Sequence, residues 1–455
     1  MSDTVKNKGW QVALAGTGIN LALGVLYAWS IFKGAIKTSI EKGGPGAFDW
    51  NPASINDPYA VCCLVFAFAM ILAGKAQDKI GPARTALIGG ILVGSGFILI
   101  SQSPSYMAWV LGFGVLAGAG FGFGYSAATP PALKWFPSSK TGLIAGIVVA
   151  GFGLAPVYIA PVSTWLLGTM GIQKSMLVFA AAFAVIVCGL SFLLVNPPAG
   201  YVPADAPKGD GAAKAAPAKP TVNATASEML KSGKFYILWA TYFIGAGAGL
   251  MVIGSVAGMA KKSMGAMAFL AVAIMALGNA GGRVVAGILS DKIGRMATLI
   301  IMFVFQAALM FAAVPIVGSG KPNAALIVLL ATFIGFNYGA NLSLFPSFSK
   351  DYWGLKNYGL NYGILFTAWG VGGFVMGRVS EMLNTQTGSF KTSFMLAGGL
   401  LVAGAVISLA LRPAKAAAPK LAAEPSARSV FMESFMRGWA DFLGFTPSTS
   451  RSMMR

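Results

Sequence analysis

Twelve apolar segments, each near or above the roughly 20 residues that a helix needs to cross a bilayer, occupy most of this 455-residue chain. They are residues 10–34, 57–77, 84–102, 105–133, 141–168, 173–195, 235–260, 265–290, 296–318, 322–349, 358–384 and 389–411. The bilayer core offers no water, so every backbone N–H and C=O must bond within its own segment, which predicts helices. Only 10% of the residues are charged. We therefore predict an all-α polytopic membrane protein embedded in the lipid bilayer.

Basic residues in the loops predict the orientation. Lys79, Lys134, Lys292 and Lys350 stand in loops on one side of the membrane, and the opposite loops hold fewer basic residues. Cytoplasmic loops carry an excess of Lys and Arg. We expect a multi-pass plasma-membrane protein, monomeric, with both termini in the cytoplasm. The net charge of +19 then belongs to these loops and does not indicate nucleic-acid binding.

A low-complexity segment divides the spans six and six. Residues 197–233 consist largely of Ala, Pro, Lys and Gly, as in a flexible cytoplasmic linker. We predict an N-terminal six-helix bundle over residues 1–196 and a C-terminal six-helix bundle over residues 234–412. Residues 413–455 form a cytoplasmic tail.

The tail contains aromatic residues at helical spacing, namely Phe431, Phe435, Trp439 and Phe442. Three charged residues fall between them and form a polar stripe of their own. This pattern predicts an amphipathic helix that lies on the membrane surface. A disordered tail with chance spacing is the alternative.

The two halves of the chain are related in sequence. Gly74–Arg84 reads GKAQDKIGPAR after the second span, and Gly287–Arg295 reads GILSDKIGR after the eighth. Asp78 and Asp291 within them are 213 positions apart, and the same offset aligns GFGYSA in the fourth span with GFNYGA in the tenth. This repeat predicts two pseudo-symmetric six-helix bundles with a substrate site between them near the bilayer midplane.

These motifs resemble a known family. The pattern G-x-x-x-D-K-x-G-x-x-R at Gly74–Arg84 resembles the signature loop of the major facilitator superfamily, and Gly287–Arg295 is similar to a second copy. GVLYAWS at 24–30, GNAGGR at 278–283 and DYWG at 351–354 resemble the oxalate/formate antiporter family and the bacterial monocarboxylate transporters. The resemblance implies a secondary transporter that works by alternating access.

One basic residue is predicted to lie deep in the membrane. Arg283 precedes Asp291 by eight residues, which places it about 12 Å deeper along the helix. Almost all of the 14 acidic residues lie in loops, tails or span ends, so no deep carboxylate is available to pair with it. Because a charge at that depth costs at least ~2.5–3.5 kcal/mol, we predict that Arg283 binds a small carboxylate anion through two parallel hydrogen bonds. The alternative is that Arg283 bonds only backbone carbonyls and tyrosines.

Five other residues are candidates for the same site, and one of them is Trp369 of the eleventh span. Tyr125 and Tyr338 are related by the repeat, and a phenol can bond a carboxylate oxygen while its ring remains in an apolar wall. Ordinary packing is the alternative for both. Asn279 is one turn before Arg283 and shares its face. Tyr27 lies in the family-like stretch of the first span.

Two departures from the resembled family bear on the substrate and on coupling. In many monocarboxylate transporters of that family an aspartate precedes the arginine by four and carries the proton, whereas Asn279 cannot titrate. Oxalate exchangers of the family carry a second cation in the eleventh span, where this chain has Trp369. One fixed charge balances one carboxylate, and a dianion would remain uncompensated in a low dielectric. The sequence therefore favours a monocarboxylate of the lactate, pyruvate or formate type.

Coupling requires a group that carries a proton or a second anion. Asp57 is the best-placed acid for proton symport, although it could simply cap the second span. The substrate itself could also carry the proton. Carboxylate/carboxylate exchange of the oxalate/formate type is the alternative, and a passive channel is disfavoured by the paired halves.

The two loop aspartates are candidate conformational latches. In resembling proteins such an aspartate interacts with neighbouring helix ends and stabilises one orientation, which assigns this role to Asp78 and Asp291. The alternative is that the loops only set topology through Lys79 and Lys292. The chain has no histidine, no metal-binding cysteine pattern and no nucleotide loop, so we expect no enzyme activity, no metal and no cofactor.

Overall fold

The computed structural model describes residues 7–51, 54–198, 200–203, 223–265, 268–317 and 323–411. Within this part of the chain all regular secondary structure is helical, which confirms the predicted fold class. The central part of the predicted linker, residues 204–222, and the predicted tail helix lie outside the described residues. The unit that contains the helices ends at Leu411.

The first half of the chain forms the helices that correspond to the first six predicted spans. They are α1 (Gly9–Leu23) continued by η1 (Gly24–Ala28) and α2 (Trp29–Lys42), α3 (Asp57–Ile80), α4 (Pro82–Gln102), α5 (Tyr106–Trp109) continued by η3 (Val110–Ala117) and α6 (Gly118–Trp135), and η4 (Ser138–Lys140) followed by α7 (Thr141–Ser191). Gly171 interrupts α7 with φ 76° and ψ 177°. Glycine adopts this conformation without steric cost. The kink divides α7 into two parts, which correspond to the spans predicted over 141–168 and 173–195, although the second part ends at Ser191.

The second half of the chain forms the remaining helices. They are α8 (Ala226–Leu230), α9 (Gly233–Met264), α10 (Ala268–Ile293), α11 (Arg295–Val317), α12 (Ala324–Trp353), α13 (Tyr358–Thr387) and α14 (Lys391–Ser408) continued by η7 (Leu409–Leu411). Ten segments of the described residues are long and apolar enough to cross a membrane. Among these segments η4 and α7 count as one, although Gly171 divides α7 into two spans, and α13 is left out. Counting α7 as two spans and adding α13 gives the twelve predicted spans.

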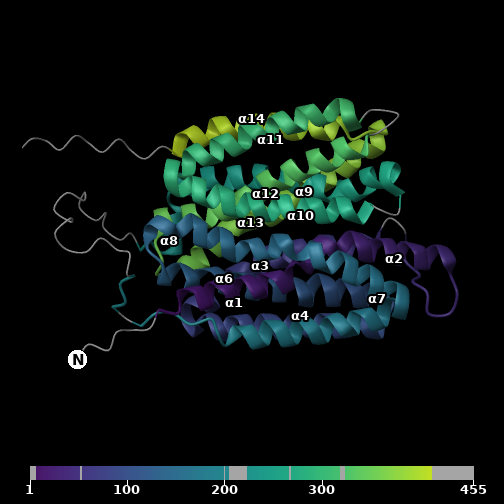
Figure 1. The fold of residues 1–455 in the computed structure, drawn as a ribbon, viewed down its shortest axis with the longest axis horizontal. Coiled ribbons are helices and arrows are strands. Elements are labelled where there is room, and N and C mark those ends of the chain that lie inside the picture. Colours follow the sequence, from purple (N-terminus) through teal and green to yellow (C-terminus); the bar gives the residue numbers. More distant parts are fainter. Residues whose placement is uncertain are drawn as a thin grey trace, which may run out of the picture. The chain divides into compact units, whose positions relative to one another are not determined.

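The helices of each half pack mainly against one another (Figure 1). In the first half α6 contacts α1, α3, α4 and α7, and α7 also contacts α1 and α4. In the second half α12 contacts α9, α10, α11 and α13, and α14 contacts α9, α11 and α13. The two halves meet chiefly where α7 contacts α10 and where α3 contacts α13. A site between the halves is therefore bordered by these two pairs of helices.

Glycine allows both of these pairs to approach backbone to backbone. A Cβ atom added to Gly74 of α3 would lie 2.0 Å from the carbonyl oxygen of Gly359 of α13. A Cβ added to Gly287 of α10 would lie 2.2 Å from the carbonyl oxygen of Gly142 of α7. Small residues permit such close contact between membrane helices. Both contacts lie at the end of the helices that carries Asp78 and Asp291, here called the linker side.

The last part of the predicted linker is structured. Thr225 and Glu228 form a reciprocal capping box that begins α8. The side-chain amides of Asn357 and Asn361 donate to the carbonyl oxygen of Ala224, at 3.1 and 3.0 Å. The segment 197–233 therefore ends in the short helix α8, and its residues just before α8 are held against the connection between α12 and α13. The Thr-x-x-Glu pattern that begins α8 is easily overlooked in a sequence of linker composition.

Candidate substrate-binding site

Arg283 is fully buried in α10, with 0% of its surface exposed. Its Nε donates to Oδ1 of Asn279 at 3.0 Å, and its Nη1 donates to the carbonyl oxygen of Val149 in α7. Its Nη2 has no hydrogen-bond partner among the described residues. None of the ion pairs found in that part of the chain includes Arg283. The guanidinium is therefore a buried cation that lacks a carboxylate partner within the described structure.

The glycines around Arg283 explain how it reaches the boundary between the halves. A Cβ added to Gly282 would lie 1.9 Å from the carbonyl oxygen of Phe336, so α10 touches the backbone of α12 there. A Cβ added to Gly146 of α7 would lie 2.4 Å from the carbonyl oxygen of Arg283 itself. α10 is thus in contact with α12 of its own half and with α7 of the other half at the same height.

Three of the predicted site residues form a hydrogen-bonded chain across the boundary. The hydroxyl groups of Tyr27 in η1 and Tyr338 in α12 are 2.5 Å apart. The indole Nε1 of Trp369 in α13 donates to the hydroxyl oxygen of Tyr338 at 2.8 Å. The guanidinium of Arg283 faces the hydroxyl group of Tyr27 and lies close enough to Tyr338 for its charge to act on both tyrosines. The structure therefore brings Tyr27, Tyr338 and Trp369 together with Arg283 and Asn279.

Tyr125 lies in an aromatic wall beside this chain. Its hydroxyl group is buried and has no hydrogen-bond partner among the described residues. Its ring contacts Phe152, Phe366 and Phe66, with centroids 5.5, 5.5 and 5.7 Å away. Tyr125 also interacts electrostatically with Arg283. The three phenylalanines are functional candidates that the sequence did not single out, because phenylalanine occurs 31 times in the chain.

Asp57 is not part of this cluster in the described structure. It lies in the first turn of α3, and its Oδ2 accepts a hydrogen bond from the hydroxyl group of Tyr106 at 2.9 Å. The N-cap residue of α3 is Asn56, so Asp57 is the first residue of the helix, where a negative charge is favourable. α3 has 24 residues, so Asp57 is about 30 Å along the helix from Asp78.

Asp78 bonds the beginning of a helix in the other half. Its Oδ1 accepts from the backbone N–H of Gly359 at 3.2 Å, and its Oδ2 accepts from that of Leu360 at 3.0 Å. Both donors belong to the first turn of α13. The N-terminus of a helix favours an anion, because its first N–H groups are free and the helix dipole is positive there.

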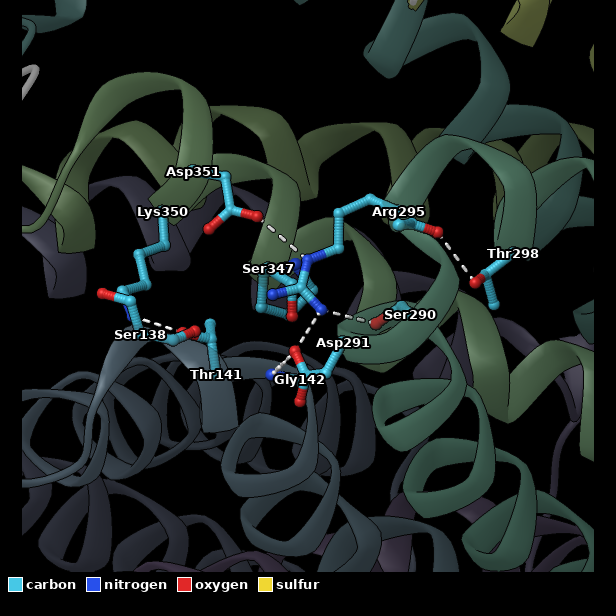
Figure 2. A network of polar contacts seen from close by, with 12 residues as sticks. Ser138, Thr141, Gly142, Ser290, Asp291, Arg295, Thr298, Ser347, Lys350 and Asp351 are labelled. Atoms are coloured by element: carbon cyan, nitrogen blue, oxygen red, sulfur yellow. Dashed lines mark hydrogen bonds and ion pairs between the residues drawn. The ribbon is translucent and has the colours of Figure 1, made fainter. Parts of the chain in front are cut away.

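Asp291 makes the equivalent contact with α7. Its two oxygens accept from the backbone N–H groups of Gly142 and Leu143, both at 2.9 Å. Nη1 of Arg295 donates to Oδ1 of Asp291 at 2.5 Å, and Nε of Arg295 donates to Asp351 at 2.9 Å (Figure 2). The aspartates therefore occupy corresponding positions in the repeat, but only Asp291 has an arginine partner among the described residues.

A buried lysine extends the contacts around Asp291. Lys350 of α12 is 9% exposed, and its Nζ donates to the hydroxyl group of Thr141 at the start of α7 (Figure 2). Ser290 accepts from Nη1 of Arg295 at 2.6 Å. The sequence indicated Lys350 only as a loop cation. Its contact with the other half was not visible in the sequence because it depends on the packing of α12 against α7.

Comparison with known proteins identifies similar sequences. The sequence model of the Major Facilitator Superfamily matches residues 10–377 and 270–446. The chain is 30% identical to the MFS-type transporter YhjX of Escherichia coli (strain K12) over 79% of this chain and 85% of that one. It is 26% identical to the oxalate:formate antiporter of Oxalobacter formigenes, over 86% of this chain and 88% of that one. It is 25% identical to human monocarboxylate transporter 11, over 89% of this chain and 83% of that one.

The fold is also similar to that of solved structures. A crystal structure of the E. coli fucose:proton symporter FucP superposes with a TM-score of 0.59 at 15% sequence identity. The superposition covers 89% of this chain and 97% of that one. This likeness concerns the fold alone.

Proposed function

The chain belongs to the major facilitator superfamily of transporters, and we propose that it carries a small monocarboxylate across the membrane by alternating access. The observation that supports this substrate most directly is Arg283, a buried guanidinium with a free Nη2 and no carboxylate partner in the described structure. Two relatives are named as an oxalate:formate antiporter and a monocarboxylate transporter. In this proposal the two bundles, residues 1–196 and 234–412, rock against each other around the site.

The charge of the site favours a single carboxylate. Arg283 supplies one positive charge. The oxalate exchangers that the sequence resembles carry a second cation at the position in α13 where this chain has the neutral Trp369. A monocarboxylate would neutralise Arg283, whereas a dicarboxylate would leave one negative charge buried at a cost of several kcal/mol. The aromatic wall of Phe66, Phe152 and Phe366 would receive the apolar end of the acid. Lactate, pyruvate and formate are the substrate types that meet these conditions.

We propose proton symport as the coupling, with carboxylate exchange as a second candidate. One observation favours exchange: Asn279, which bonds Arg283, cannot release or accept a proton, and Asp57 does not contact the cluster. In symport, the proton would enter with the substrate or on Asp57. In exchange, a second anion would replace the first on Arg283, so that the carrier never changes its orientation with the guanidinium unpaired.

We also propose that Asp78 and Asp291 hold the linker side closed. Each carboxylate joins the end of one helix to the beginning of a helix in the other half, so opening this side must break both sets of bonds. The basic loops on that side assign it to the cytoplasm in this proposal. The plasma membrane is the proposed location.

The experiment that tests the site is uptake of labelled lactate, pyruvate and formate by purified protein in proteoliposomes. Arg283→Gln should lower the uptake rate at least about 30-fold, because truncating one member of a buried charge pair costs about 2 kcal/mol or more. Arg378→Gln is a matched control, since Arg378 is exposed on α13, where it lies over the ring of Phe374. Near-normal uptake by a correctly inserted Arg283→Gln variant would refute the proposed function.

The same vesicles distinguish the two forms of coupling. Symport should drive accumulation into empty vesicles when an inward proton gradient is imposed. Exchange should require unlabelled acid inside the vesicles and should be insensitive to the gradient. Stimulation by internal acid in either case argues against a passive channel.

A further inference from the structure

Arg283 is held from across the boundary by the backbone of α7. Nη1 of Arg283 donates to the carbonyl oxygen of Val149, although the two residues belong to different halves. Gly153 follows Val149 by one turn on the same face of α7. A Cβ added to Gly153 would lie 3.0 Å from Nε of Arg283 and 3.0 Å from Oδ1 of Asn279. The side chains of Arg283 and Asn279 therefore lie directly against Gly153, which has no side chain of its own.

The hydrogen bonds of the guanidinium show which of its donors a substrate can use. Nε is bonded to Asn279, Nη1 is bonded to Val149, and Nη2 is free among the described residues. A carboxylate that binds arginine with two parallel bonds needs two neighbouring N–H donors. Nη2 can supply one of them, and its neighbour Nη1, which carries two N–H groups and donates one of them to Val149, can supply the other. The bond to the carbonyl of Val149 is the one that joins the two halves.

We propose that the carbonyl oxygen of Val149 occupies the substrate's place on Nη1 in the empty carrier, and that Gly153 is a positioning residue that leaves room for the guanidinium. This proposal rests on the proposed function, since it assigns the binding geometry of the same site. A carboxylate shares one negative charge between its two oxygens, so its bonds to the guanidinium include the attraction of an ion pair, which the neutral carbonyl of Val149 does not provide. The substrate therefore replaces the carbonyl of Val149, and the backbone of α7 prepares Arg283 for binding while the site is empty.

A side chain at position 153 should weaken binding without preventing transport. A methyl group 3.0 Å from two polar atoms forces the guanidinium or the amide to move by several tenths of an ångström, because such a contact is tighter than ordinary packing. The displaced guanidinium no longer meets both carboxylate oxygens in good geometry. We expect Gly153→Ala to raise the KM for lactate, pyruvate and formate alike by about tenfold, which corresponds to one weakened charged hydrogen bond. Vmax should change by less than about twofold, since the latches and the helix contacts remain.

Two glycines provide matched controls. Gly281 lies in α10 two residues before Arg283, and Gly189 lies in α7, and a Cβ added to either would meet no atom within 4 Å. Gly281→Ala and Gly189→Ala should therefore keep the wild-type KM. They exclude a general effect of alanine on these two helices. Gel filtration and thermal stability of each variant report whether it folds.

A double-mutant cycle makes the test specific for the contact. Asn279→Ser shortens the side chain opposite position 153, so Gly153→Ala should raise the KM less in the Asn279→Ser protein than in the wild type. If the single Gly153→Ala variant is poorly folded, the KM of the double variant is compared with that of Asn279→Ser, and equal values would overturn the proposal, because the added methyl group still meets Nε of Arg283. Equal effects in the two backgrounds would overturn the proposal, as would a KM for Gly153→Ala equal to that of the two controls.

The outcome separates this inference from the function on which it rests. Arg283→Gln is measured in the same vesicles. If that variant transports normally, the proposed function fails. If Arg283→Gln loses transport while Gly153→Ala behaves like Gly281→Ala, the substrate site stands and only the role of α7 is refuted.

Discussion

Replacing Asp291 by asparagine tests the closed linker side with little change in shape. In the native protein Oδ1 accepts from the backbone of Gly142 and from Arg295, at 2.9 and 2.5 Å, and Oδ2 accepts from the backbone of Leu143 at 2.9 Å. Asp291→Asn removes the charge and turns one of these acceptors into an NH2 group. Whichever way the amide is turned, that NH2 group faces an N–H donor.

The magnitude follows from the bonds that are lost. A hydrogen bond to a charged group contributes about 1.5–3 kcal/mol, and Asp291→Asn removes one such bond across the boundary or leaves a buried N–H donor of this cluster facing the new NH2 group. The side chains of Asp291 and Arg295 are only 10% and 11% exposed, so water compensates little. We expect the closed state to lose about 2–4 kcal/mol, which shifts the equilibrium toward opening roughly 30- to 700-fold.

Asp78→Asn is the matched comparison. Asp78 makes two backbone hydrogen bonds, at 3.2 and 3.0 Å, is exposed, and has no ion pair among those found in the described residues. Its bonds are longer and better screened by solvent, so we expect a loss of about 1–2 kcal/mol and a shift of roughly 5- to 30-fold.

The assay is a distance measurement between labelled cysteines on the linker side. The native cysteines are first replaced, and exposed label sites then report each pair of helices: Ser139 with Lys292 for α7 and α10, and Lys79 with Lys356 for α3 and α13. Spin-label or single-molecule fluorescence distances give the closed fraction with and without substrate. An unchanged closed fraction in Asp291→Asn, or a larger shift in Asp78→Asn, would refute the reasoning from bond number and burial.

Two further predictions concern selectivity and the tail. Trp369→Lys places a second cation beside Tyr338, so the ratio of oxalate to lactate affinity should rise by about tenfold or more; competition uptake measures it, and preference for oxalate in the wild type would contradict a monocarboxylate site. A chain that ends after Ala418 should still transport, because every residue of the proposed site precedes Leu411; loss of uptake in correctly inserted truncated protein would show that the tail takes part.

The helices could be predicted where hydropathy dominates and less well where it does not. The first predicted span ends at residue 34, but α2 continues to Lys42, because polar residues can extend a helix beyond the apolar core. Lys37 and Glu41 form an i,i+4 ion pair there at 3.8 Å, which supports the extra turns. The division of α7 at Gly171 was predicted as two spans, since glycine and polar residues separate the apolar runs.

The site was predictable where residue type carries the chemistry. A deep arginine without a deep carboxylate is visible in the sequence, and helical spacing places Asn279 on its face. The repeat related Tyr338 to Tyr125 but did not reveal the bond from Tyr338 to Tyr27. The carbonyl of Val149 could not be foreseen, because every residue has a carbonyl group and only the packing of α7 on α10 selects this one.

The placement of Arg283 and Asp291 on one helix links the substrate site to the latch. Both residues belong to α10, eight positions apart, and both bond α7, at Val149 and at Gly142 and Leu143. The contact between α3 and α13 has Asp78 but no site cation among the described residues. In the proposed mechanism a substrate that takes Nη1 from Val149 removes one of the bonds between α7 and α10, so the loaded carrier is joined across this boundary by fewer bonds than the empty one. Binding therefore lowers the free energy needed to separate α7 from α10, and the change acts on the helix pair that Asp291 holds.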